Sequence, residues 1–230
     1  MRPYFAAAVL AALLCTVPSR AADVTFPPGA GVRNVRTEFG AKGDGVADDT
    51  AAVRRAFAAC QQKHMEVVYF PAGTYLVTGP VHFRGWVFAQ GESRDRTVIK
   101  LKDNCPGYAD PKKPNYLFAT TPPAEPDTRP GGDNMAFSNH VLDLTLDTGT
   151  GNPAAIGVQF ISHNGGGLER VTVRSGDGRG LIGIDLRTPW NGPCLFKDVR
   201  VDGFDTGVET WHATYSSTFE DIDLVRQNKV

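Results

Sequence analysis

Short apolar strand motifs recur in the second half of the sequence at a nearly constant distance. One series consists of VLDLTL (141–146), LERVTV (168–173), FKDVRV (196–201) and FEDIDL (219–224), which begin 27, 28 and 23 residues apart. A second series runs in step with it and consists of GVQF (157–160), GIDL (183–186) and GVET (207–210), spaced by 26 and 24 residues. Two strands per period are typical of a β-solenoid, in which each coil completes its core against its neighbours. The sequence therefore predicts an all-β parallel β-helix.

Residues within each repeat are expected to alternate between core and solvent. In VLDLTL the apolar residues then point inward, whereas Asp143 and Thr145 point outward. Equivalent positions of successive coils stack about 4.8 Å apart. An outward column of Asp143, Arg170, Asp198 and Asp221 results, and its mixed charges predict salt bridges between coils.

The outward positions of the second series predict the candidate functional site. They comprise Gln159, Asp185 and Glu209 in one column and Ile161, Arg187 and Trp211 in the next. Asp185 and Glu209 are predicted to be catalytic, because two carboxylates can act as acid and base or nucleophile on a glycosidic bond. Repulsion between them would favour protonation of one, as a general acid requires. Gln159, Arg187 and Trp211 are predicted to bind substrate, since arginine pairs with a uronate carboxylate and an indole stacks on a sugar ring. The alternative is that these positions are polar only because they are exposed.

The stretch FGAKGDGVADDTAAV (39–53) combines three glycines and three aspartates with the start of a helix. Beyond it, apolar residues recur at steps of three and four at Val53, Ala56, Phe57 and Cys60, which predicts a short amphipathic helix. Aspartates at such a point accept hydrogen bonds from unpaired backbone N–H groups. We therefore expect Asp44, Asp48 and Asp49 to form a turn and an N-cap, with a metal site as the less favoured alternative. Strands are expected at 67–70 and 74–78.

This N-terminal region resembles a known family. The segments NVRTEFGAKGDGVADDTAAVRRAF, VVYFPAGTYLV and GWVFAQGESRDRTVIKL are similar to the opening of the pectate lyase-like superfamily, and more narrowly to the rhamnogalacturonase/epimerase-like pectate lyase domain of glycoside hydrolase family 28-related proteins. The resemblance is dense over residues 34–101. It implies a right-handed parallel β-helix with a short N-terminal capping α-helix.

The resemblance assigns no catalytic residue. Its polygalacturonase branch carries NTD, DD and GHG motifs, and this chain has only Asp48-Asp49, which belongs to the expected cap. Ca²⁺ is a candidate cofactor if the reaction is that of a lyase, and no metal ligands are predicted. The leading hypothesis is an enzyme that hydrolyses a pectin-like or other polysaccharide, or cleaves it by β-elimination. The alternatives are a non-catalytic glycan-binding or tailspike-like adhesin module and a polysaccharide C5-epimerase.

The ends of the chain suggest export and truncation. Residues 1–21 combine Arg2, an apolar run and a small-residue cleavage site, as in a secretory signal peptide. We therefore expect a secreted or periplasmic protein of one domain (22–230), with no membrane contact after signal removal. The mature net charge of −3 (22 − 25) does not favour nucleic-acid binding. Since no cap follows the last repeat, we expect the domain to be truncated at its C-terminal end.

Two features of the chain leave more than one interpretation. The proline-rich segment 104–134 is expected to form a long loop. Cys60, Cys105 and Cys194 are expected to be buried thiols, although one disulfide is allowed in an exported protein. The oligomeric state is not predicted.

Overall fold

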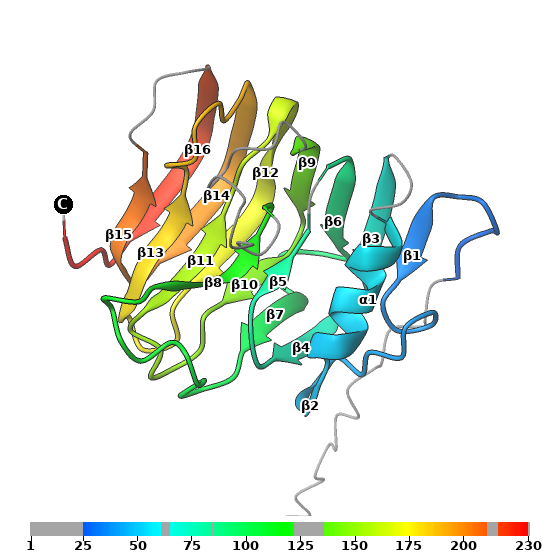
Figure 1. Ribbon diagram of the computed structural model, residues 1–230, viewed down its shortest axis with the longest axis horizontal. Helices are drawn as coiled ribbons and strands as arrows, with labels where there is room; N and C mark the ends of the chain where they lie inside the picture. Colours follow the sequence, from blue (N-terminus) through cyan, green and yellow to red (C-terminus); the bar gives the residue numbers. More distant parts are fainter. Residues whose placement is uncertain (1–24, 61–64, 84, 122–135, 211–215, 230) are drawn as a thin grey trace, which may run out of the picture.

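The structure is a computed structural model that describes residues 25–60, 65–83, 85–121, 136–210 and 216–229. Its strands wind as a right-handed parallel β-helix, and helix α1 (Thr50–Cys60) lies at the N-terminal end of the stack (Figure 1). The predicted fold class is confirmed. The predicted signal peptide lies outside the described residues.

Two parallel sheets form the walls of the coil. Sheet A contains β1 (Val32–Asn34), β2 (Asp44–Asp48), β3 (Glu66–Phe70), β4 (Gly73–Val77), β6 (Val87–Gly91), β7 (Thr97–Leu101), β9 (Phe137–Leu142), β10 (Thr145–Asp147), β12 (His163–Arg174), β14 (Cys194–Asp202) and β16 (Ser217–Val225). Sheet B contains β5 (Val81–His82), β8 (Asn115–Ala119), β11 (Ala155–Gln159), β13 (Gly180–Asp185) and β15 (Phe204–Glu209). Sheet A has two arms, β1-β3-β6-β9 and β2-β4-β7-β10, which both join β12 and continue through β14 to β16.

The pairing register follows the sequence repeat. Val141 pairs with Leu168, Leu168 with Phe196, and Phe196 with Phe219, so the four motifs align at their first residues. The side chains at the first three of these positions are buried in the core. Hydrophobic burial on one face thus sets the register, because a slip by one residue would turn this set outward.

A left-handed bend interrupts each of these motifs. Asp143, Arg170, Asp198 and Asp221 all have positive φ angles, between 50° and 54°. We call this column the bend ladder. It marks the line along which the two arms of sheet A meet.

The predicted simple alternation in VLDLTL is wrong because of this bend. Val141, Leu144 and Leu146 are fully buried, whereas Leu142 is only half-buried. The left-handed residue at Asp143 resets which side chains face inward, so the two halves of the motif follow different parities. Thr145 pairs in register with the half-buried Val98 and Thr172, on the outward side as predicted, but it is only 4% exposed and its hydroxyl donates to the Arg94 carbonyl at 2.8 Å.

Helix α1 covers the core at the N-terminal end, as predicted. Its residues Val53, Ala56, Phe57 and Cys60 are buried. The Phe57 ring stacks on Phe83 at a centroid distance of 4.6 Å and meets Phe118 edge-on at 5.6 Å. Aromatic packing therefore closes the apolar interior of the first coils.

The aspartates before α1 act differently from one another. The Asp48 carboxylate accepts hydrogen bonds from the Thr50 N–H (2.9 Å) and hydroxyl, whereas Asp44 accepts from two backbone N–H groups of its own turn. Asp49 precedes the first helical residue, but its buried carboxylate turns back to accept from the N–H groups of Lys42 (2.7 Å) and Gly43 (2.9 Å). The N-cap prediction is thus wrong for Asp49, because the glycine turn places unpaired N–H groups within its reach.

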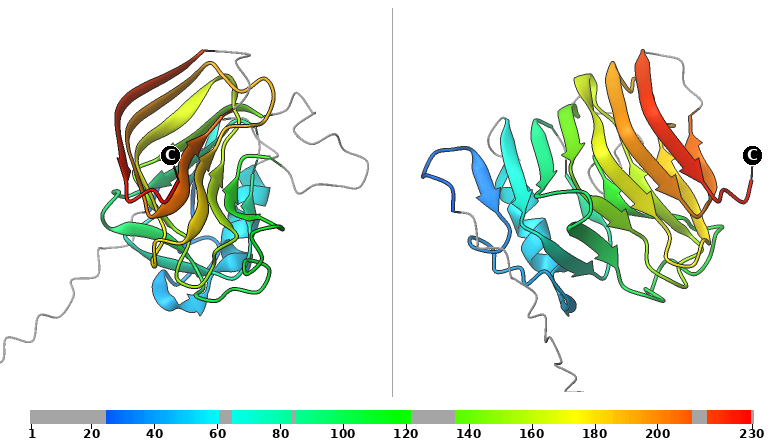
Figure 2. Two further views of the ribbon diagram at one scale, coloured as in Figure 1. Left: turned by 90° about the vertical axis from the view of Figure 1, so that its left-hand side faces the viewer. Right: turned by 180° about the vertical axis from the view of Figure 1, so that it is seen from behind.

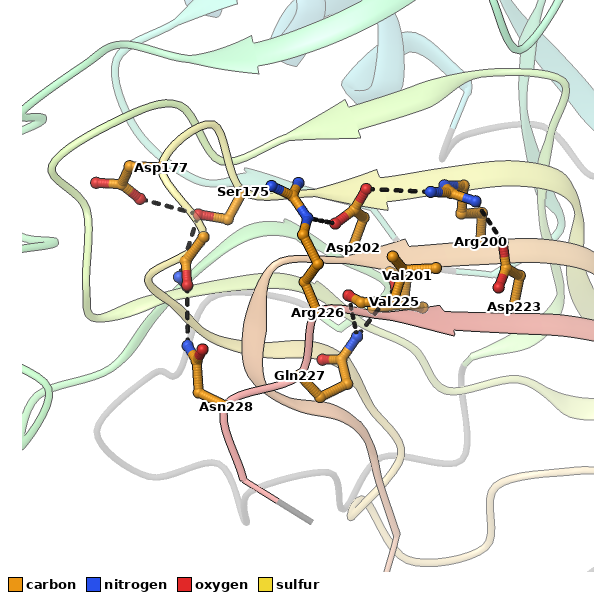
Figure 3. Close-up of polar contacts among 12 residues, drawn as sticks. Ser175, Asp177, Arg200, Val201, Asp202, Asp223, Val225, Arg226, Gln227 and Asn228 are labelled. Atoms are coloured by element: carbon orange, nitrogen blue, oxygen red, sulfur yellow. Dashed lines mark hydrogen bonds and ion pairs between the residues drawn. The ribbon is translucent and has the colours of Figure 1, made fainter.

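Ion pairs between coils line the outside of sheet A. Arg170 binds Asp143 through Nε at 2.5 Å, as the predicted column requires, whereas Asp198 pairs with Arg94 at 2.7 Å. In the last coils Asp202 accepts from Arg226 of the next coil at 2.6 Å and from Arg200 of its own strand at 3.4 Å (Figure 3). The salt-bridge prediction holds for the first of these pairs.

In the last described coil, side chains at positions that face the core in earlier coils are exposed. Phe219 is 47% exposed and Leu224 is 50% exposed, although their partners in the preceding coil, Phe196 and Val201, are fully buried. The end view in Figure 2 shows β16 as the outermost strand of the stack, with no further strand drawn over it. The expectation of truncation remains a prediction.

The predicted loop 104–134 is wrong in part, because β8 lies within it. The NYLFA segment of β8 pairs with both β5 and β11 in sheet B. Its flanking prolines and irregular distance from the later repeats hid it in the sequence. Residues 122–135 lie outside the described part of the chain.

Two further predictions concern thiols and membranes. Cys60, Cys105 and Cys194 are buried free cysteines. Among the described residues, no helix is both long enough and apolar enough to cross a membrane.

Candidate functional site

The predicted polar column exists on sheet B. Gln159 pairs in register with Asp185, and Asp185 with Glu209, so three successive coils contribute one residue each. In two of these coils, at Gly157 and Gly183, the glycine two residues earlier lies close to the backbone of the next strand. A Cβ on Gly183, for example, would lie 2.6 Å from the carbonyl oxygen of Gly207. The glycines at 157 and 183 therefore allow the close approach of neighbouring strands beside the polar column.

Arg187 joins two of these residues into one cluster. Its Nε and Nη2 donate to the two oxygens of the Asp185 carboxylate, each at 2.9 Å, and its Nη1 lies 3.3 Å from Glu209 Oε1. The backbone N–H of Arg187 also donates to Asp185, at 3.0 Å. A bidentate arginine–carboxylate pair with a further backbone bond is a rigid arrangement. The pKa of Arg187 is raised, mainly by this hydrogen bonding to Asp185, while burial acts in the opposite direction.

The two predicted catalytic carboxylates have different environments. Asp185 lies in register with Gln159 and Glu209 as predicted, but it is only 2% exposed and its carboxylate is bound by Arg187, so it is not accessible as predicted. The Glu209 side chain is 38% exposed. The guanidinium lies between the two negative charges and offsets the repulsion on which the general-acid argument depended.

Gln159 continues the site towards the N-terminal coils. Its Oε1 accepts a hydrogen bond from the Thr121 hydroxyl at 2.5 Å. Its Nε2 lies 3.4 Å from the Tyr116 hydroxyl and 3.5 Å from the Thr188 hydroxyl, both long contacts. The pKa of Tyr116 is raised, first by burial and then by the negative charge of Asp185. Sequence reasoning missed Tyr116, because it belongs to the strand that the predicted loop concealed.

The column beside this one is not as predicted. Ile161 is buried, and its N–H donates to the Thr120 hydroxyl at 2.7 Å. Trp211 lies outside the described residues.

A different indole is exposed in the loop that follows Arg187. Trp190 follows Arg187 by three residues and is 49% exposed. Its φ of 63° is an outlier for a bulky residue, and its carbonyl lies 2.9 Å from Nδ1 of the buried His163 ring. The only sequence signal for it was its place in the RTPWNGP loop after a repeat strand.

The described residues were expected to include no metal ligands. Among the described residues, no group of three or more His, Cys, Asp or Glu side chains is arranged to hold a metal ion. The carboxylates of Asp44, Asp48 and Asp49 bind backbone N–H groups instead.

The fold and the outward polar column define the class of the protein as a pectate lyase-like parallel β-helix. The chain belongs to the family described as Rhamnogalacturonase A/epimerase, pectate lyase-like, which matches residues 32–229. The resemblance of the N-terminal segments is thereby confirmed.

Several curated proteins and solved structures are similar to part of the chain. A glucan 1,3-beta-glucosidase of Cochliobolus carbonum is 31% identical over 140 residues, which are 56% of this chain and 17% of that protein. The mannuronan C5-epimerase AlgE5 of Azotobacter vinelandii is 41% identical over 73 residues, which are 29% of this chain and 7% of that protein. Among solved structures, Geobacillus virus E2 ORF18 has a TM-score of 0.58 at 19% identity and covers 83% of this chain and 41% of that one. The chain spans only 6% to 17% of four curated relatives.

Proposed function

We propose that this chain is the β-helix of a secreted enzyme that cleaves a polysaccharide on the outer face of sheet B. The observation that carries the proposal is the Gln159–Asp185–Glu209 column with Arg187 laid across it. Successive coils place these groups at about the strand spacing of 4.8 Å, which suits an extended polymer better than a small ligand. Its family and its glucosidase relative agree with such a substrate.

Glycoside hydrolysis is the reaction that the residues support best. Glu209 is the exposed carboxylate and is placed to transfer a proton to or from the glycosidic oxygen or the attacking water. Asp185 is the second carboxylate that the reaction requires, and it would become accessible only if Arg187 moved aside. Trp190, three residues after Arg187 in the chain, is an exposed indole that could take the role predicted for Trp211.

A second candidate is a glycan-binding module without catalysis. It is favoured by the burial of Asp185, which leaves Glu209 as the only exposed carboxylate in the described part of the column. In that case Arg187 and Asp185 only stiffen a binding surface.

The assay incubates the full secreted protein with several neutral and acidic polysaccharides. Hydrolysis releases reducing ends without near-UV absorbance, β-elimination adds that absorbance through a new double bond, and C5-epimerisation changes product composition without cleavage. Glu209→Gln is expected to lower the hydrolysis rate at least about 100-fold, the usual range for a general acid or base. The matched control is Glu220→Gln on sheet A, where the glutamate pairs with Lys197 at 2.6 Å. Binding without turnover in wild type and both variants would instead support the binding module.

Export is tested by the mass of the secreted protein. Cleavage after Ala21 would give a mature chain that begins at Ala22. An N-terminus that still contains Met1 would contradict the signal-peptide prediction.

A further inference from the structure

The charges of sheet B differ from those expected for a surface that binds an acidic polymer. None of its strands β5, β8, β11, β13 and β15 contains a lysine or an arginine, whereas they contain three carboxylates. One of these, Asp205, pairs with Lys229 at 2.6 Å. The other two are Asp185 and Glu209, which belong to the candidate site.

The cation nearest to the column is already engaged. Three of the five N–H groups of Arg187 point at carboxylate oxygens: Nε and Nη2 at Asp185, and Nη1 at Glu209. The cluster carries one positive and two negative charges, so its formal charge is 1 − 2 = −1. A sugar carboxylate that approached Arg187 would compete with Asp185 and Glu209 for its N–H groups and would meet the net negative charge of the cluster.

The polar groups that remain suit hydroxyl groups. The Glu209 carboxylate accepts hydrogen bonds, and the Gln159 amide and Thr188 hydroxyl both donate and accept. The contacts between Gln159 Nε2 and its two hydroxyl neighbours are long, at 3.4 and 3.5 Å, so a sugar hydroxyl could replace either without a large loss. An exposed indole at Trp190 adds apolar surface for a ring face.

We infer that the sheet B site binds neutral sugar residues, without a carboxylate or sulfate, and that Arg187 is an internal counterion rather than a uronate ligand. The inference rests on the proposed function and narrows its substrate class. It replaces the sequence-based expectation that Arg187 pairs with a uronate. Because β-elimination and C5-epimerisation both act beside a uronate carboxylate, a neutral substrate leaves hydrolysis as the reaction.

The test compares two polymers that differ only in charge: polygalacturonate and the neutral galactan made from it by carboxyl reduction, together with a neutral β-1,3-glucan. Binding is measured by affinity electrophoresis and calorimetry at low and at physiological salt. Wild type is expected to bind a neutral polymer at least about tenfold more tightly than polygalacturonate at low salt, since like charges at close range repel. The preference should shrink as salt rises.

Two variants separate the causes. Glu209→Gln removes one negative charge and releases Arg187 Nη1, so its affinity for polygalacturonate should rise about fivefold or more. Glu220→Gln is the matched control and should leave both affinities unchanged.

Preference of wild type for polygalacturonate, or a loss of polygalacturonate binding in Glu209→Gln, would overturn the inference and leave the proposed function standing. Failure to bind any polymer would overturn the proposed function and with it this inference.

Discussion

Single alanine substitutions at the repeated glycines of sheet B test how closely neighbouring strands pack. Gly183 and Gly207 occupy the same position of the repeat, one coil apart. A Cβ on Gly183 would lie 2.6 Å from the Gly207 carbonyl oxygen and closer still to a methyl group of Val201. A Cβ on Gly207 would meet only the side-chain ends of Gln227 and Leu224, each at 3.2 Å. The same substitution to alanine therefore meets a backbone oxygen at position 183 and side-chain ends at position 207.

The expected cost follows from these distances. An ordinary contact begins at 3.4 Å, so the alanine at 183 requires a local displacement of about 0.8 Å (3.4 − 2.6) between backbones that pair in the sheet. Overpacking of this kind costs about 1–3 kcal/mol. Lower entropy of the unfolded chain returns about 0.4–1 kcal/mol. We expect Gly183→Ala to lower the free energy of unfolding by about 1–2 kcal/mol, whereas Gly207→Ala changes it by less than about 0.5 kcal/mol.

Urea unfolding followed by tryptophan fluorescence measures both variants. With a slope of about 2 kcal/mol per molar urea, Gly183→Ala should move the midpoint down by about 0.5–1 M. Gly157→Ala is a second copy of the test, because its Cβ would lie 2.7 Å from the carbonyl oxygen of Gly183. Equal midpoints for Gly183→Ala and Gly207→Ala would refute the argument that backbone crowding selects glycine here.

Three further predictions concern other parts of the chain. Asp49→Ala should destabilise the fold by about 1–3 kcal/mol, because it leaves two N–H groups of the glycine turn without their acceptor. Asp44→Ala, in an exposed turn, should destabilise the fold clearly less. Equal shifts of the melting temperature in the two variants would contradict this prediction. The pKa of Asp143 is lowered, and the largest cause is its hydrogen bond from Arg170. The ion pair therefore stabilises the fold above the ordinary aspartate pKa of about 3.9, and this contribution is lost as the pH falls through the lowered pKa of Asp143. Arg170→Ala should therefore be less stable than wild type by up to about 1 kcal/mol at pH 7, with a difference that vanishes in acid; a difference independent of pH would exclude the ion pair as its cause. Burial raises the pKa of Cys60 and Cys194 to about 12. In the chain without residues 1–21, a thiol reagent at pH 8 should therefore modify none of the three cysteines while the protein is folded and all three in urea. Rapid labelling of the folded protein would show that the core opens.

The sequence predicted the strands, their register and the position of the polar column because all three follow from hydrophobic periodicity. Val158, Ile184 and Val208 align in the structure as they do in the motif. Such alignment needs no knowledge of side-chain conformation. The burial of apolar residues decides it.

The missed features depend on single backbone angles and side-chain conformations. The left-handed bend at Asp143 has no apolar signal, so the alternation was predicted wrongly on one side of it. The burial of Asp185 arises because Arg187 turns back by two residues rather than outward, and a residue spacing cannot distinguish these directions. Tyr116 was missed since its strand does not share the spacing of the later repeats.

The bend ladder also marks the positions at which a whole coil could be duplicated or deleted. Its residues at 143, 170, 198 and 221 occupy the same backbone conformation, so the chain has the same direction at each of them. A segment cut from one ladder position to the next, such as 170–197, carries a complete circuit of the helix with its own corner. Duplicating or deleting such a segment would lengthen or shorten the stack by one layer while the flanking strands meet compatible neighbours. The proposed binding face on sheet B would grow or shrink by one position in the same step, so the length of polymer that we propose it accommodates would be tied to the number of layers.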